Sequence, residues 1–323
     1  MKAAVMYHNA EVPQYVDFPE PTAQTENEII VTVKAVAIKH FDKGRAAGSH
    51  YSADAPAESG HIPGGDGVCL LQDMSRVYGM GVSGMLAEKA TIDKNRIVKL
   101  PSGLSDATAA ALANAVIGAA MALRFKAGIQ PGDVVLINGA TGFTGRVAVQ
   151  IAKYYGAKKV IATGRNERSL QDLYSLGADE VISVKLEAEE FMAQLKNIHK
   201  KSPVDIVIDY LWGSAAEMIL ASLMGNGSFT HKTRFVSVGS MAGDLIRLSA
   251  ANLRSVDLEL TGSGLGSWPK DQVSLLFSEI LPEMFQLAAE GKLQVGTIEV
   301  KLQDIAAIWN LNVPDGQRLV VTV

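Results

Sequence analysis

The sequence predicts an α/β protein in which a doubly wound parallel sheet is combined with a second, antiparallel, barrel-like module. Three observations support this prediction. Apolar strands alternate with helices from residue 134 onward, which is typical of parallel sheets covered by helices on both faces. The first hundred or so residues are instead rich in strands and punctuated by Pro and Gly. A glycine turn joins the first apolar strand of the middle region to a helix.

The first module is predicted from short strands and Gly/Pro loops. Met1–Tyr7 looks like a first strand and lacks the long apolar segment of a signal peptide. Glu28–Ile38 alternates and is rich in β-branched residues, as a half-buried strand would be. Loops are expected around residues 47–51 and 61–67. We expect these strands to form an antiparallel, barrel-like sheet.

The middle of the chain changes to a strand–helix period. An alanine-rich helix is expected from Ser105 to Leu123, followed by a turn at Gly128–Asp133. The strands and helices expected after it are Val134–Asn138, Thr144–Tyr155, Lys159–Thr163, Ser169–Leu176, Glu180–Val184, Glu187–His199, Asp205–Asp209, Phe235–Gly239 and Leu258–Thr261. This order predicts a parallel sheet wound in two directions.

The C-terminal stretch returns to isolated strands. A helix is expected at Gln272–Ala289 and strands at Val295–Val300 and Arg318–Val323. Because the parallel sheet is inserted between strand-rich ends, we expect the C-terminus to rejoin the first module. The predicted organisation is a first domain at 1–114, a nucleotide-binding domain at 115–256, and a segment 257–323 that supplies the last parallel strands and the return.

Composition narrows the functional classes. A chain of 323 residues is long enough for two domains, and its net charge of −4 with mixed signs gives no reason to expect nucleic acid or an acidic membrane as a partner. Cys69 is the only cysteine, which excludes an intramolecular disulfide and a cysteine-rich zinc site. We expect its thiol to be buried in the core. No apolar run approaches the roughly 20 residues of a membrane span, so a cytoplasmic protein is expected.

The stretch Val134–Gly145 carries the strongest functional signal. It has the form of a buried strand, a glycine turn and the start of a helix, and a helix N-terminus offers backbone donors and a partial positive charge to a phosphate. Gly142 and Gly145 allow close approach of backbone, while Phe143 and Thr144 are expected to donate N–H groups. A short glycine pattern is weak evidence and a plain turn is the alternative, but the βα units that follow favour a dinucleotide site.

The end of the next strand indicates which dinucleotide. An NAD site usually carries an acidic side chain about 20 residues after the glycine turn, whereas NADP sites often carry an arginine near the 2′-phosphate. Here Gly164 is followed by Arg165, with Arg168 close behind. The planar guanidinium suits a phosphate, so NADPH is the expected cofactor. The alternative is that Arg165 is a solvated loop charge.

Six segments of the chain, taken together and in order, have a recognisable pattern: residues 1–5, 33–42, 62–67, 132–145, 176–182 and 204–209. With these segments the chain resembles the medium-chain dehydrogenase/reductase superfamily, and within it the zinc-free quinone oxidoreductase branch. The resemblance covers almost the whole chain. It implies a GroES-like catalytic domain and a Rossmann domain that hold NADPH in the cleft between them.

The resemblance also implies the cofactor residues. Gly142, Phe143 and Thr144 match the pyrophosphate turn, and Arg165 matches the 2′-phosphate position. Thr141, Gly145, Gly164 and Arg168 complete these two groups of predicted cofactor residues. Segments lining the ribose and nicotinamide are matched by Leu211, Val238, Gly239, Ser240, Ser263, Gly264 and Leu265, and Arg318 matches a basic residue beside the cofactor.

A catalytic zinc is not expected. Zinc-dependent relatives use a Cys and a Gly-His-Glu motif, but Lys39 stands at the position of the Cys and Pro63-Gly-Gly-Asp66 at that of the motif. A displaced site of His40, His61 and Asp66 is the alternative, opposed by the positive charge of Lys39. Without a metal, reduction of an activated acceptor such as a quinone or enone is still feasible, because the acceptor delocalises the new charge onto oxygen.

Three residues are candidates for contact with the acceptor. Lys39 replaces an Asn that is frequent in the branch, and either donates to the acceptor carbonyl, pairs with Asp42 or points into water. Tyr51 matches a tyrosine at the mouth of the cleft and either covers the substrate or packs in its loop. Asn114 lies in the alanine-rich helix and needs a hydrogen-bond partner, which is either helix backbone or ligand.

The predicted function is a zinc-independent, NADPH-dependent reductase of a small quinone or α,β-unsaturated carbonyl. An enoyl-thioester reductase is one alternative, and a non-catalytic NADPH-binding sensor or structural protein is another, which the departure at Lys39 keeps open. Residues 68–79 are abbreviated relative to the branch, which weakens any transfer of substrate identity. A homodimer formed through the edge of the nucleotide-binding sheet is also expected from the resemblance.

Overall fold

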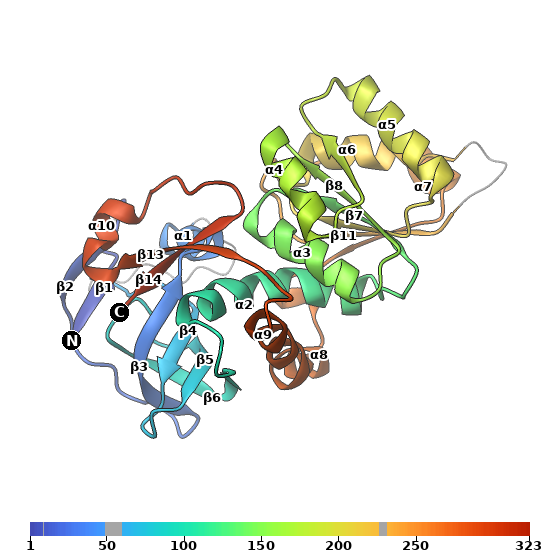
Figure 1. Cartoon of the computed structure of the whole chain (residues 1–323). Helices are drawn as coiled ribbons and strands as arrows, with labels where there is room; N and C mark the ends of the chain where they lie inside the picture. The colour runs from blue at the N-terminus through green and yellow to red at the C-terminus, as the bar shows by residue number, and fades with distance from the viewer. Residues whose placement is uncertain (9, 49–59, 226–230) are drawn as a thin grey trace. The chain divides into compact units, whose positions relative to one another are not determined.

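A computed structural model describes residues 1–8, 10–48, 60–225 and 231–323. The chain forms two compact units (Figure 1). Unit 1 comprises Met1–Asn114 and Phe277–Val323, and unit 2 comprises Ala115–Leu276. The chain passes from unit 1 to unit 2 between Asn114 and Ala115, within the long helix α2 (Asp106–Met121).

Unit 2 is built on a six-stranded sheet in which every neighbouring pair is parallel. Its spatial order is β12 (Leu258–Gly262), β11 (Thr233–Ser237), β10 (Ile206–Asp209), β7 (Val134–Asn138), β8 (Lys159–Gly164) and β9 (Glu180–Ser183). The chain runs outward from β7 to β9, then returns and runs outward again from β10 to β12. The doubly wound fold is therefore confirmed, with its topological switch point between β7 and β10.

Helices flank this sheet (Figure 1). They are α3 (Phe143–Tyr154), α4 (Glu167–Asp172), α5 (Ala188–Lys201), α6 (Gly213–Ser222) and α7 (Ala250–Ser255). Unit 2 also includes α8 (Lys270–Leu275). The strands carry side chains that are fully buried, with an exposure of 0 %: Leu136, Ile137, Ile161, Val207 and Phe235. Burial of each such side chain contributes roughly 1.5–3 kcal/mol to folding, so the continuous apolar runs of the sequence become the core on both faces of the sheet.

Unit 1 contains a mostly antiparallel sheet in the order β13 (Gly296–Lys301), β14 (Gln317–Thr322), β3 (Glu28–Ala37), β4 (Asp66–Leu70), β5 (Arg76–Gly81) and β6 (Lys89–Lys99). The long strand β3 pairs with both β4 and β6. Because β4, β5 and β6 also pair in sequence, these four strands close on themselves, which confirms the barrel-like module. A separate ribbon pairs β1 (Lys2–Val5) with β2 (Gln14–Asp17). The helices are α1 (His40–Ala46), α9 (Leu281–Ala289) and α10 (Ile305–Ile308).

The structure corrects some of the expected elements. The helix expected at Gln272–Ala289 is present and uninterrupted from Lys270 to Ala289, but it includes a π-helical turn at Leu276–Ile280 between α8 and α9 (Leu281–Ala289). Pro282 in the first turn of α9 has no N–H to continue an α-helical ladder, so the hydrogen bonds change register before it. The loop expected at 61–67 ends earlier, because β4 begins at Asp66.

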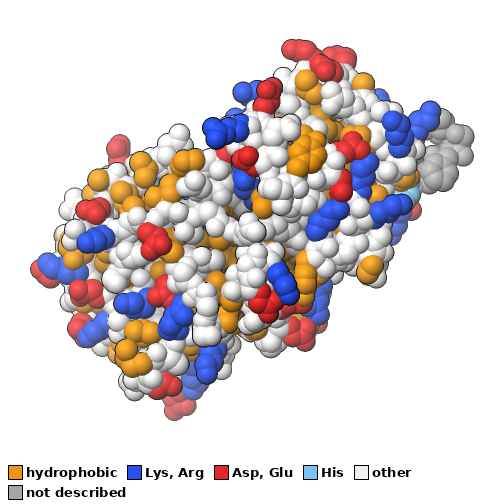
Figure 2. Space-filling model, in the orientation of Figure 1, with side chains coloured by type: hydrophobic (Ala, Val, Ile, Leu, Met, Phe, Trp, Pro, Cys, Tyr) orange, Lys and Arg blue, Asp and Glu red, His pale blue; other side chains and the backbone are white. Residues whose placement is uncertain are grey.

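The alanine-rich helix is part of the core. The segment Asp106–Lys126 is long and apolar enough to cross a membrane, but 78 % of its most apolar window is buried inside the protein, as in the core helix of a globular protein. On the face of the molecule shown in Figure 2, acidic and basic side chains are interspersed, as the mixed composition predicts. Cys69 is fully buried and burial raises its pKa to about 12, so the prediction of a core thiol is confirmed.

Candidate functional site

The glycine turn lies at the carboxyl end of β7, directly beside the switch point. Gly139 opens the turn with φ of +85°, a conformation that favours glycine. Gly142 is the N-cap residue of α3 and has no side chain to accept hydrogen bonds from the helix. The first turn of a helix has donors without intrahelical acceptors, and such N-termini are common binding sites for anions.

Close packing requires the glycine at position 145. A Cβ added there would lie 2.4 Å from the carbonyl oxygen of Gly139 and 2.6 Å from Cα of Ala140. Both contacts are with backbone, which cannot move aside without displacing the turn. Gly145 therefore allows α3 to start directly against the turn, and the residues present fit a pyrophosphate held by backbone groups.

The end of β8 has a glycine, Gly164, followed by two arginines, Arg165 and Arg168. A Cβ on Gly164 would lie 2.4 Å from Cγ2 of Thr141, so an acidic residue at this position, as in an NAD site, would require the Thr141 side chain to move. Arg165 and Arg168 follow it and are exposed. Among the described residues no carboxylate forms an ion pair with either arginine. Asn166 between them caps α4 by accepting a hydrogen bond from the Ser169 N–H at 3.1 Å.

Three further loops leave the same edge of the sheet. Leu211 follows β10, and a Cβ on Gly139 would meet its side chain at 3.0 Å, so this leucine lies against the glycine turn. The loop after β11 begins with Val238, whose N–H donates to the Asp209 carbonyl at 2.7 Å. After β12, Ser263 donates its N–H to the Ser237 carbonyl at 2.8 Å and accepts from Trp268 Nε1 at 3.1 Å.

The structure thus places the predicted cofactor residues of unit 2 on loops at one edge of one sheet. These residues are Thr141, Gly142, Phe143, Thr144, Gly145, Gly164, Arg165, Arg168, Leu211, Val238, Gly239, Ser240, Ser263, Gly264 and Leu265. Arg318, the remaining predicted cofactor residue, belongs to β14 of unit 1.

Sequence reasoning missed three buried polar residues beneath this edge. Asn138, Thr163 and Asp209 stand at or next to the carboxyl ends of β7, β8 and β10, and each is 0 % exposed. They are joined to one another by hydrogen bonds between side chains. The available signal was a polar residue closing each of three otherwise apolar strands.

In unit 1, Lys39 forms the centre of a buried ionic cluster. It is 2 % exposed and lies between the end of β3 and the start of α1. Its Nζ lies 3.2 Å from Oδ2 of Asp42 and also contacts Oδ1 of Asp66. Burial by itself lowers the pKa of Lys39, but Asp42 and Asp66 together outweigh that effect and raise it. These contacts agree with one of the three alternatives for Lys39, the ion pair with Asp42, and they add Asp66 as a second partner.

Tyr78 completes this cluster from β5. Its hydroxyl donates to Oδ2 of Asp66 at 3.0 Å, and its ring packs edge-on against Phe285 with centroids 5.7 Å apart. Burial, followed by the charge of Asp66, raises the pKa of Tyr78, so the phenol stays protonated and acts as a donor. Both carboxylate oxygens of Asp66 are thereby engaged, one by an ammonium and one by a hydroxyl.

Asn114 has a partner that the sequence reasoning did not consider. Nη1 of Arg318 donates to the Ala111 carbonyl at 3.3 Å and to Oδ1 of Asn114 at 3.5 Å. The amide of Asn114 thus meets an arginine side chain from a distant strand rather than helix backbone. Burial lowers the pKa of Arg318 to about 10, against the opposing charges of two aspartates, so it remains cationic at neutral pH. Tyr51 lies outside the described residues.

The alternative metal site is not assembled in the described part of the chain. Within residues 1–8, 10–48, 60–225 and 231–323, no group of three or more His, Cys, Asp or Glu is placed to hold a metal ion. Of the residues drawn into that alternative, His40 is exposed, His61 bridges to Met6, and Asp66 contacts Lys39.

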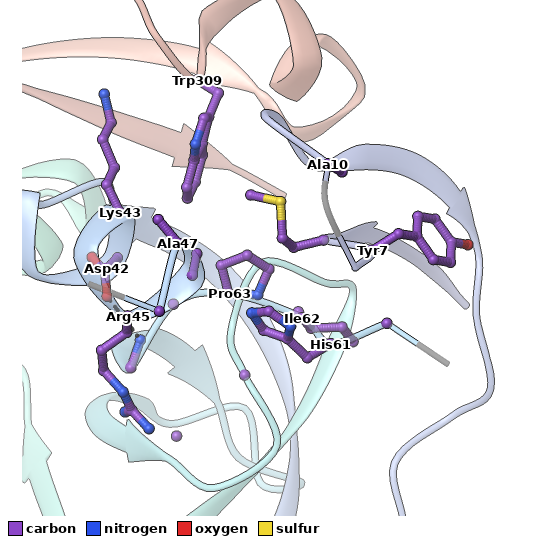
Figure 3. A pocket seen from close by; sticks show the side chains of 18 of the residues that line it. Tyr7, Ala10, Asp42, Lys43, Arg45, Ala47, His61, Ile62, Pro63 and Trp309 are labelled. Carbon is purple, nitrogen blue, oxygen red and sulfur yellow. Dashed lines mark hydrogen bonds between the residues drawn. The ribbon is translucent and has the colours of Figure 1, made fainter. Parts of the chain in front are cut away.

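A cavity of about 800 Å³ lies beside this cluster in unit 1 (Figure 3). Asp42 is shared between the cluster and the cavity wall. The lining of the cavity includes the apolar residues Ile62 and Trp309. It also includes Lys43, whose Nζ lies 6.0 Å from the centre of the Trp309 ring. The wall is mixed in character, because it also contains charged Glu11 and Arg45.

A glycine turn, an uncapped helix and three loops at a switch point define a dinucleotide-binding protein. Comparisons with known proteins agree with this class. Residues 144–286 match the family described as zinc-binding dehydrogenase. A probable NADPH-dependent quinone reductase from Emericella nidulans is 27 % identical over 360 residues, covering 99 % of both chains.

Two further similarities are informative. The quinone oxidoreductase of Thermus thermophilus, whose structure is known alone and with NADPH, has a TM-score of 0.81 and 25 % identity, with 100 % of both chains covered. A mycocerosic acid synthase-like polyketide synthase from Mycobacterium tuberculosis is 33 % identical over 232 residues, but the match spans only 10 % of that protein. These similarities agree with the expected resemblance to the quinone oxidoreductase-like branch of the medium-chain dehydrogenase/reductase superfamily.

Proposed function

We propose that the protein is a zinc-independent, NADPH-dependent reductase that transfers hydride to a quinone or an α,β-unsaturated carbonyl. The observation that carries this proposal is the carboxyl edge of the unit 2 sheet. There an uncapped helix N-terminus, a glycine turn and two exposed arginines occur together. The relatives from Emericella nidulans and Thermus thermophilus support the cofactor and the acceptor class.

NADPH supplies the hydride when it is bound. In this proposal the turn from Thr141 to Gly145 holds the pyrophosphate through backbone donors. Arg165 and Arg168 hold the 2′-phosphate, for which an arginine offers paired donors. Gly164 carries no acidic side chain for the ribose of NADH, and a side chain there would meet Thr141 Cγ2 at 2.4 Å. The loops at 211, 238–240 and 263–265 are assigned to the ribose and nicotinamide.

The absence of zinc from the proposed reaction rests on the chemistry of the residues in unit 1. The carboxylates of Asp42 and Asp66 are engaged by the Lys39 ammonium, which opposes the approach of a dication. A quinone or enone accepts hydride at an electron-poor carbon, a donor to its oxygen stabilises the resulting anion, and that anion then takes a proton from water. We assign that donor to Arg318, held by Asn114, and assign to Lys39 the role of fixing the cluster beside it. Tyr51 is retained as a predicted cover or donor.

The test begins with binding and then turns to turnover. Mixing the purified protein with NADPH is expected to change the fluorescence of the nicotinamide, and NADH is expected to bind more weakly. Oxidation of NADPH is then followed with a panel of quinones, enones and enoyl thioesters, in parallel with elemental analysis for zinc. Absence of NADPH binding would refute the cofactor, and stoichiometric zinc would refute the metal-free reaction. Binding without turnover of any acceptor would favour a sensor.

The second candidate is an enoyl-thioester reductase. It is favoured by the 33 % identity to a segment of a mycobacterial polyketide synthase. Such an enzyme requires a basic surface for the phosphate of its acyl carrier and an acid to protonate the product. Turnover of enoyl thioesters at a kcat/KM well above that of quinones would select this function over the first.

The expected homodimer is a separate proposal. Sedimentation of the same samples would test it.

A further inference from the structure

A chain of buried hydrogen bonds crosses the switch point of the unit 2 sheet. Thr163 Oγ1 donates to Oδ1 of Asn138 at 2.6 Å, and Nδ2 of Asn138 donates to Oδ1 of Asp209 at 2.7 Å. These residues come from three adjacent strands, β8, β7 and β10. Each side chain is 0 % exposed, so none of these bonds can be exchanged for bonds with bulk water.

The direction of every hydrogen bond in this chain is determined by its last member. The Asp209 carboxylate can only accept, so the Asn138 amide must present its NH₂ to it and its oxygen to Thr163. The hydroxyl proton of Thr163 is therefore used on Asn138. Its oxygen is left to accept from the Gly139 N–H, at 3.3 Å. The carboxylate thus acts through two side chains on the first residue of the glycine turn.

The same carboxylate holds a second loop directly. Oδ1 of Asp209 accepts from the N–H of Leu211 at 2.9 Å, and both of its oxygens accept from the N–H of Trp212 at 3.1 Å. Trp212 has φ of +58°, which is unfavourable for a residue with a bulky side chain. Local contacts that over-determine such a residue are needed to maintain it, and the two bonds to Asp209 supply them.

A third loop is attached to the same position through the backbone. The carbonyl oxygen of Asp209 accepts from the N–H of Val238 at 2.7 Å and of Gly239 at 3.2 Å. The Leu211 carbonyl accepts from the Ala242 N–H at 2.8 Å. Asp209 therefore contacts the loops after β10 and β11 directly, and it acts on the loop after β7 through the side chains of Asn138 and Thr163.

We propose that Asp209 is a positioning residue for NADPH, which acts through Asn138 and Thr163 on the glycine turn and directly on the Leu211–Gly213 turn. This inference rests on the proposed function, because it assigns NADPH to these loops. None of the three side chains touches the cofactor in this proposal. Their role is to hold three loops in the arrangement that the bound dinucleotide requires, so that binding does not have to order them.

A matched pair of threonines separates this role from general stability. Thr163 and Thr233 are both 0 % exposed, lie on strands of the same sheet, and donate one short hydrogen bond each. Thr233 donates to the Val204 carbonyl at the opposite, amino end of the sheet. We expect Thr163→Val to weaken NADPH binding about tenfold, equivalent to one hydrogen bond. Thr233→Val is expected to lower the melting temperature similarly and leave NADPH affinity unchanged.

Variants of Asp209 provide the rescue test. Asp209→Ala removes the acceptor and is expected to weaken NADPH binding more than tenfold. Asp209→Asn keeps an oxygen at the Oδ1 position and is expected to retain affinity within about threefold of wild type. Amide hydrogen exchange at Gly139, Leu211 and Trp212, measured without cofactor, is expected to accelerate in Asp209→Ala and not in Thr233→Val.

The outcomes distinguish the inference from the proposed function. If the wild-type protein does not bind NADPH, the proposed function is refuted and this inference with it. If the wild type binds NADPH, and Thr163→Val and Thr233→Val bind it equally well, the positioning role alone is refuted. Unchanged exchange at Gly139 and Trp212 in Asp209→Ala would refute it as well, even where that variant binds NADPH too weakly to measure.

Discussion

Replacement of Lys39 by methionine tests the buried ionic cluster of unit 1. Lys39 and Asp42 have side-chain exposures of 1 % and 3 %, and Asp66 has 7 %, so the three charged groups lie almost entirely out of water. Methionine has a similar length and packs well in irregular core space. The Lys39→Met change therefore removes the charge while largely preserving the volume, and it leaves two buried carboxylates without their cation.

The expected cost follows from this burial. Removing one partner of a buried ion pair costs about 3–5 kcal/mol, because the remaining charge is left uncompensated. We expect a loss of this size in the free energy of unfolding of Lys39→Met near pH 8. The exposed pair Lys2–Asp17, with exposures of 41 % and 82 %, provides the control. Surface pairs contribute little, so Lys2→Met is expected to leave unfolding unchanged.

The loss is expected to depend on pH. Burial already raises the pKa of Asp42, against the opposing effect of Lys39. Without the ammonium that pKa rises further above its unfolded value, so the folded variant binds a proton that the unfolded chain does not. The stability of Lys39→Met relative to wild type should therefore recover as pH falls from 8 to 5. Protonation of the carboxyl removes the uncompensated charge.

The assay is urea unfolding of wild type, Lys39→Met, Lys2→Met and the double variant Lys39→Met/Asp66→Asn at both pH values. The double variant removes one of the two stranded charges and is expected to regain part of the lost stability at pH 8. Equal unfolding free energies for Lys39→Met and wild type would refute the account. So would a loss that is the same at pH 5 and pH 8, because it would then come from packing rather than charge.

Four further outcomes are expected. Arg165→Ala and Arg168→Ala should each raise the KM for NADPH about tenfold, the effect of a charge-assisted hydrogen bond, with little change in the KM for NADH; equal effects on both cofactors would contradict the phosphate assignment. Gly145→Ala should abolish NADPH binding measured by fluorescence, because its Cβ meets the backbone carbonyl oxygen of Gly139 at 2.4 Å; tight binding would contradict the cradle. Asn114→Ala should lower kcat severalfold while the dissociation constant of NADPH stays the same, since it removes one of the contacts that hold the Arg318 guanidinium; a change in NADPH affinity alone would place Asn114 with the cofactor instead. Incubation with a chelator should leave turnover unchanged, and loss of activity restored by zinc would overturn the metal-free proposal.

Local pattern was sufficient for most of the nucleotide-binding unit. The strand predicted at Val134–Asn138 is β7 with the same bounds, because five consecutive apolar-rich residues ended by a glycine turn have few other solutions. Elements with weaker patterns were less well predicted. Strands β4 and β5 were not identified, because they contain glycines and are short, so no clear alternation marks them. The helix expected at Gln272–Ala289 is present, but its π-helical turn at Leu276–Ile280 was not predicted, although Pro282 lies just after it.

The candidate site divides in the same way. Residues of the glycine turn and of the Gly164–Arg168 segment are close to one another in sequence or follow a repeated βα unit. Their chemistry could therefore be predicted from the sequence alone. The pairing of Asn114 with Arg318 was not, because 204 positions separate the two residues. Nor did any local feature of Asn138 point to Asp209, which lies 71 positions away.

By itself the sequence determined the classes of element, the parallel sheet and the phosphate turn, because these follow from hydrophobic periodicity and from backbone constraints that act over a few residues. Only the tertiary structure decided which polar groups meet. Lys39 finds Asp66 across 27 positions, and Asp209 reaches the glycine turn through Asn138, because strand order brings these ends together. A buried charge destabilises the fold unless it is paired with an opposite charge or hydrogen-bonded, and the tertiary structure determines which group is its partner.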